Sequence, residues 1–79
     1  MSAVVLPFPL AARRDLVLRQ AAWYCEQGYS AAEKNLRRQV DVQHQTMLRR
    51  GVDPAVAADE CRSLEWAIRE TARRFGGVA

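Results

Sequence analysis

The most regular hydrophobic pattern in this sequence of 79 residues lies in residues 54–75, which read PAVAADECRSLEWAIRETARRF. Asp53 is expected to cap a helix here, Pro54 suits its first position, and Gly76-Gly77 should end it. Such a helix needs the rest of the chain to cover its apolar face. That face is predicted from positions at alternating spacings of four and three, namely Ala57, Cys61, Leu64, Ile68, Thr71 and Phe75.

A first helix is expected over residues 11–27, with Gly28 following its C-cap. Leu16 and Trp23 are seven residues apart and would form a narrow second stripe on nearly the opposite side of this helix. Its main apolar face is predicted to consist of Leu10, Val17, Leu18, Ala21, Tyr24 and Cys25.

A second helix is expected over residues 30–50, and Gly51 should stop it. Ser30 and Glu33 have the spacing of a capping box, in which the hydroxyl and the carboxylate each accept a hydrogen bond from the other residue's backbone amide. The stripe of this helix is predicted to be Tyr29, Ala32, Leu36, Val40, Gln43 and Met47.

Both connections between the helices are short, so neighbouring helices should run antiparallel. We therefore predict an all-α fold, a three-helix up-down-up bundle over residues 11–76, with an extended apolar arm at 1–10 and a tail at 77–79. Pro7 and Pro9 exclude helix from the arm. The arm either folds back over a helix groove or inserts into a partner. It resembles neither a signal peptide nor a membrane span, which favours a cytoplasmic protein.

The composition describes one small domain with a thin core, which needs tight packing, a staple or a partner. The net charge is +3, and 11 of the 12 basic residues are arginine. Arginine suits phosphate and carboxylate contacts, although a GC-rich genome would also favour it. Cys25 and Cys61 should differ in height by roughly 15 Å in this bundle, so we expect reduced core thiols and no disulfide.

No pattern in the sequence indicates a catalytic, cofactor-binding or metal-binding site. His44 is the single histidine, and no cysteine spacing matches a zinc site. A nucleophile–base pair would need His44 close to Cys25 or Cys61, and the spacing does not bring them together. We therefore expect no enzyme and no cofactor, and we identify no small-molecule substrate.

Paired arginines are the first feature that suggests a binding function. Cations near a helix end complement its dipole, which explains the pairs at 49–50 and 73–74. Arg13-Arg14 has no such explanation, because it lies in a first turn. One hypothesis is therefore a nucleic-acid-binding accessory protein, although a solvated charged face would look the same. Its candidate residues are Arg13, Arg14, Lys34, Arg37 and Arg38.

The tryptophans are the second such feature, because both lie off the predicted stripes. Large aromatic residues among arginines are typical of protein-interaction hot spots. Two alternatives remain open: the arm covers Trp23, or Arg62 or Arg69 stacks on Trp66 as a cation–π pair. The first hypothesis is a non-enzymatic interaction or regulatory module that binds a protein or itself, forming a homodimer. Its candidate partner-binding residues are Trp66, Trp23, Phe8, Arg62 and Arg69.

Three segments resemble a family of short uncharacterised alphaproteobacterial proteins, which begin with a V-V-x-F-P-type arm followed by paired arginines. The segments are VVLPFPLAARRDLVLRQA at 4–21, LRRQVDVQ at 36–43 and RRGVDP at 49–54. The resemblance implies a bacterial, cytoplasmic protein. It supplies no activity, cofactor or site residue, but it does direct attention to the arm and to Arg13-Arg14.

Overall fold

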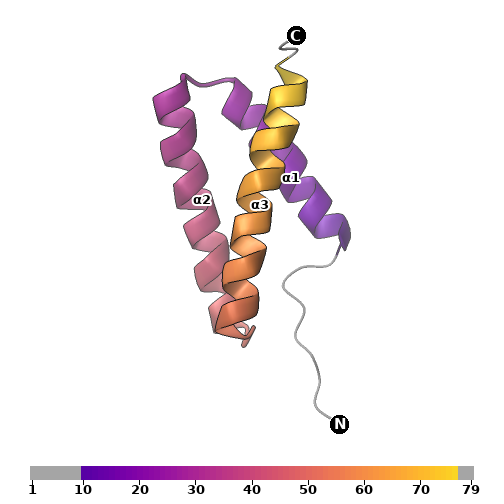
Figure 1. Ribbon diagram of the computed structural model, residues 1–79, viewed down its shortest axis with the longest axis vertical. Helices are drawn as coiled ribbons and strands as arrows, with labels where there is room; N and C mark the ends of the chain where they lie inside the picture. Colours follow the sequence, from indigo (N-terminus) through magenta and orange to yellow (C-terminus); the bar gives the residue numbers. More distant parts are fainter. Residues whose placement is uncertain (1–9, 77–79) are drawn as a thin grey trace.

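The computed structural model describes residues 10–76, which form an all-α three-helix bundle (Figure 1). The helices are α1 (Leu10–Cys25), α2 (Tyr29–Arg49) and α3 (Pro54–Phe75). α2 runs antiparallel to α3, and α1 crosses α3 in the same general direction, as the up-down-up prediction requires. Leu10 belongs to α1, and the rest of the predicted arm and tail lies outside the described residues.

α3 begins as the sequence predicts. The Asp53 carboxylate accepts a hydrogen bond from the backbone N–H of Val56 at 3.4 Å, and Pro54 occupies the first turn. This cap satisfies one of the backbone donors that every helix start leaves without an intrahelical partner.

The inner face of α3 supplies residues to both hydrophobic clusters of the core. One cluster joins Leu64 and Ile68 to residues of α1 and α2, and the other joins Ala57 and Cys61 to the end of α2 and the following turn. The partners are Leu16, Val17 and Leu36 in the first cluster, and Met47 and Val52 in the second.

The α2–α3 turn is a Schellman motif. Gly51 has φ +89°, its N–H donates to the Leu48 carbonyl at 3.1 Å, and the Val52 N–H donates to the Met47 carbonyl at 3.0 Å. Val52 and Met47 are both buried in the second cluster. The motif therefore ends α2 at the predicted glycine and positions an apolar residue under the start of α3.

The predicted main face of α1 was correct at Val17 and Ala21, which are buried, but wrong at Leu18 and Cys25. Leu16 is buried, whereas Leu18 is 42 % exposed and Cys25 is also exposed. The reason is that α1 packs against both α2 and α3, so its buried sector is turned toward Leu16. Apolar residues surround this helix on nearly all sides, and spacing alone does not select the buried ones.

The stripes of α2 and α3 were also wrong at one end each. Tyr29 is 76 % exposed because it lies in the first turn of α2, at the edge of the bundle. At the far end of α3, Ala72 is buried in place of Thr71, and Phe75 is exposed. The actual helical repeat exceeds 3.5 residues, so a stripe with alternating spacings of four and three drifts off the buried face over five turns.

Two predicted caps do not form. α1 ends at Cys25, and Gly28 has φ −65° and serves as the N-cap of α2 instead of following the C-cap of α1. No side chain caps the start of α2, so the Ser30–Glu33 capping box is absent. The Glu33 carboxylate accepts hydrogen bonds from other helices, which removes it from the helix start.

The left-handed conformation of Gly51 gives a stability prediction. Gly51→Ala should lower the free energy of unfolding by about 1 kcal/mol, because a side chain is strained at positive φ. Gly51→Asn is the matched comparison: asparagine enters the left-handed region more readily than alanine, so it should lose less stability. Urea denaturation followed by circular dichroism measures both, and equal losses would contradict the role given to Gly51.

Candidate functional site

A carboxylate at the junction of the three helices joins them by hydrogen bonds. Glu33 of α2 accepts a hydrogen bond from the Tyr24 hydroxyl of α1 and two from the Arg69 guanidinium of α3. The Arg69 donors are Nη2 at 2.7 Å and Nε at 3.1 Å, and Nη2 also donates to Glu65 at 2.8 Å. A bidentate pair of this kind fixes geometry as well as adding energy, so the junction holds this end of the bundle together.

The junction shifts the pKa of its members. The hydrogen bonds from Arg69 and then from Tyr24 lower the pKa of Glu33 to about 2. Burial, followed by the hydrogen bond to Glu33, raises the pKa of Tyr24 to about 12. Both shifts stabilise the same state, a charged Glu33 beside a neutral Tyr24. Apart from the i,i+4 spacing of Glu65 and Arg69, no pattern in the sequence indicated this junction.

A second set of side-chain hydrogen bonds joins α1 to α3, near the N-terminal end of α1. Arg13 donates from Nε to Glu60 at 2.8 Å and from Nη2 to the Ser63 hydroxyl at 2.6 Å. This long-range ion pair with Glu60 explains why an arginine is found in the first turn of α1, for which the local sequence gave no reason. Arg14 is exposed, and within residues 10–76 it has no carboxylate at ion-pair distance.

The outer face of α3 centres on Trp66, which is 66 % exposed. Arg62 is hydrogen-bonded to Asp59 on the N-terminal side of the indole, and Arg73 is hydrogen-bonded to Glu70 on its C-terminal side. The hydrogen bond from Arg73 lowers the pKa of Glu70. We call Asp59, Arg62, Trp66, Glu70 and Arg73 the Trp66 face; its formal charges cancel.

The expected partner-binding residues are not gathered into one site. Trp66 and Arg62 share the outer face of α3, whereas Arg69 is directed toward α2 and holds two carboxylates. Phe8 lies outside the described residues, and its contact with a partner stays a prediction. The two arginines of the cation–π alternative each bind a carboxylate, Arg62 that of Asp59 and Arg69 that of Glu33.

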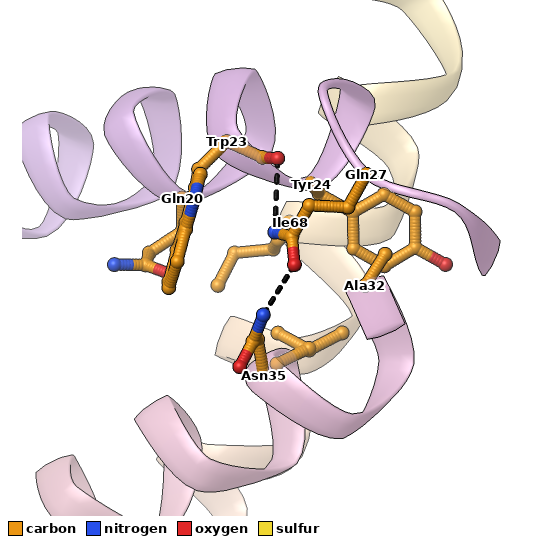
Figure 2. A pocket seen from close by; sticks show the side chains of 8 residues that line it. Gln20, Trp23, Tyr24, Gln27, Ala32, Asn35 and Ile68 are labelled. Atoms are coloured by element: carbon orange, nitrogen blue, oxygen red, sulfur yellow. Dashed lines mark hydrogen bonds between the residues drawn. The ribbon is translucent and has the colours of Figure 1, made fainter. Parts of the chain in front are cut away.

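Trp23 belongs to a different part of the surface, the seam between α1 and α2 (Figure 2). Its ring lies beside Gln20 and is 42 % exposed. Gln27 donates to the Trp23 carbonyl at 3.1 Å and accepts a hydrogen bond from Asn35. These two hydrogen bonds connect the end of α1 to α2 next to the indole. Trp23 therefore packs partly within its own bundle, and the structure does not bring it to Trp66.

The outward side of α2 is basic. Lys34, Arg37 and Arg38 are exposed, and no ion pair to them occurs among residues 10–76. Asp41 is the acidic residue that interrupts this surface, which we call the α2 basic face. Arg13 and Arg14 lie on α1, so the nucleic-acid candidates are divided between two helices.

The two thiols have different surroundings. Cys61 is buried as expected, and burial raises its pKa, whereas Cys25 is exposed and its thiol donates to the Ala72 carbonyl at 3.1 Å. The prediction that Cys25 is a core residue was therefore wrong. Both cysteines are free, and no three potential metal ligands cluster within residues 10–76.

This chain belongs to the family of unknown function DUF6074, which matches it over residues 1–78. The match confirms the expected resemblance to an uncharacterised family. No curated protein and no solved structure matches the chain. In the part of the chain that the structure describes, none of the helices has the length and apolar character needed to cross a membrane.

The low pKa of Glu33 gives a pH-dependent prediction. A carboxyl whose pKa falls from about 4.5 to about 2 on folding adds stability above pH 4.5, and that stability is lost as the pH falls toward 2. Glu33→Gln should cost about 1–2 kcal/mol at pH 7 and much less at pH 2. Urea titrations at both pH values measure this difference.

Glu26→Gln is the matched control for this prediction, because it removes an exposed carboxylate from the connection between α1 and α2. It should change the free energy of unfolding little at either pH. A Glu33→Gln loss that is the same at pH 7 and pH 2 would contradict the assignment of the charge-assisted bonds.

Proposed function

We propose that this chain is a small non-enzymatic protein-interaction or regulatory module that uses the Trp66 face to bind protein, itself included. The observation that carries the proposal is the exposure of Trp66 at the centre of a face whose charges are already paired. The resemblance in residues 4–21 and the two free thiols support a bacterial cytoplasmic location.

The energetics favour an interface at this face over simple solvation. Burial of an exposed tryptophan side chain contributes roughly 3–4 kcal/mol from its apolar area. The neighbouring Arg62–Asp59 and Arg73–Glu70 pairs are exposed, so each contributes little to the stability of the isolated chain. An aromatic residue enclosed by a polar rim is the arrangement found at interaction hot spots.

The α2 basic face supports a second candidate function, the binding of nucleic acid. The acidic residues of α3 pair with arginines of α1 and α3, and Glu33 pairs with Arg69, so these carboxylates form no ion pair with the α2 basic face. Exposed lysine and arginine side chains are the groups that contact phosphate backbones without sequence preference. Asp41 within the face reduces its net charge, which is why this candidate is second.

Trp66→Ala tests the first proposal. The tagged protein is purified from the cells that make it, and the proteins that co-purify with it, copies of itself included, are identified. Wild type and Val42→Ala should both retain these proteins, whereas Trp66→Ala should lose them. Val42 is the control because it is an exposed apolar side chain on α2. In a Trp23→Phe background, the fluorescence of Trp66 should shift to shorter wavelength when the partner binds, since the indole leaves water. Retention of every protein by Trp66→Ala with an intact fold would disprove the proposal.

A titration with generic duplex and single-stranded DNA at two salt concentrations tests the second candidate. Binding should weaken steeply as salt rises, with a slope of about 0.9 per phosphate contacted on duplex DNA. Arg37→Gln/Arg38→Gln should lose this binding, whereas Arg62→Gln/Arg73→Gln removes the same charge from the Trp66 face and should retain most of it. Equal loss in the two variants would indicate a net-charge effect and contradict a site on α2.

A further inference from the structure

The Trp66 face has a symmetry that its composition alone does not show. Its residues are separated by three, four, four and three positions, and the spacing is the same when read from either end. The charges read negative, positive, Trp66, negative, positive. Read in the opposite direction, every charged position carries the opposite sign.

This pattern is complementary to a second copy of itself in antiparallel orientation. A two-fold axis at Trp66 places Arg62 of one copy opposite Glu70 of the second copy, and Asp59 opposite Arg73. The axis produces each pair twice, so four oppositely charged pairs surround two tryptophans. A parallel arrangement would place every charged residue opposite its own copy, and like charges would repel.

We propose that this chain forms a homodimer through antiparallel packing of α3 on α3, centred on Trp66. The inference rests on the proposed function and names its partner as a second copy of the chain. A closed two-fold contact uses one surface patch on both subunits, which must be complementary to itself. The Trp66 face satisfies that requirement in both spacing and charge.

In the isolated chain, the charges of the Trp66 face form ion pairs with one another, and these can be exchanged for pairs with a second copy. Arg62 binds Asp59 and Arg73 binds Glu70 within one copy, and the helical repeat places all four residues on the same side of α3 as Trp66. In the dimer, each arginine gains a carboxylate of the second copy on the opposite helix. No charge of this face is left without a partner when the indoles are buried, which avoids the large cost of a buried unpaired charge.

The size of the contact sets the expected affinity. The distance from Asp59 to Arg73 along the helix is about 21 Å at 1.5 Å per residue. A single helix pair of that length belongs to the small interfaces, which are typical of weak and reversible association. We therefore expect a dimer with a dissociation constant in the micromolar range.

Charge reversal at one pair of the interface tests the proposal by sedimentation velocity. Arg62→Glu and Glu70→Arg should each weaken self-association by about tenfold or more, because each places like charges opposite one another twice. An equimolar mixture of the two variants should form a mixed dimer, since each carboxylate at position 62 or 70 then faces an arginine of the other copy. The double variant Arg62→Glu/Glu70→Arg should also self-associate. Arg19→Glu makes the same charge change as Arg62→Glu, but at an exposed position of α1, and should leave association unchanged.

Asp59→Arg and Arg73→Asp form a second, independent set for the same test, with circular dichroism confirming that each variant is folded. A wild-type chain that stays monomeric at millimolar concentration would overturn the proposal. A mixture of Arg62→Glu and Glu70→Arg that associates no better than either variant alone would also overturn it. If one of these two results is obtained while a different protein is still captured in a Trp66-dependent way, the dimer is disproved and the proposed function stands. If Trp66→Ala changes neither capture nor self-association, both fail.

Discussion

The burial of the inner stripe of α3 is the constraint on which the rest of the structure depends. Leu64 and Ile68 belong to one core cluster and Ala57 and Cys61 to the other, so this stripe runs through the whole core. Once those four side chains face inward, the 3.6-residue repeat directs Trp66 away from the core. The exposure of this tryptophan among residues 10–76 therefore follows from the packing that makes the fold.

Ion pairing then divides the charge of the molecule between its surfaces. Glu60 is held by Arg13, Glu65 and Glu33 by Arg69, and these pairs lie where helices meet. The carboxylates used in this way form no ion pair with the outward side of α2. A mild net charge of +3 consequently coexists with one distinctly basic helix face and one helix face whose charges cancel.

The sequence was sufficient wherever a local signal agreed with the tertiary structure. The Asp53 cap, the stop at Gly51 and most of the α3 stripe were predicted correctly, because helix ends and a single buried face depend on neighbouring residues. It was insufficient for α1, whose apolar residues allow several buried faces until a second helix is placed against it. Arg13 and Glu33 were misjudged for the same reason, since their partners lie on other helices.

The residues of the candidate site are subject to a different constraint from those of the core. Core packing requires an apolar periodicity, which any stable helix of this length must carry, whereas the outer face of α3 is free of that requirement. A solvated face needs charged residues, and both of its i,i+3 pairs, Asp59–Arg62 and Glu70–Arg73, have the acid first, which is the favoured order within one helix. What the folding of one chain does not require is the placing of these two pairs at equal distances on either side of an exposed Trp66. Two antiparallel copies do require that arrangement, which is why we propose an interface between copies on the outer face of α3.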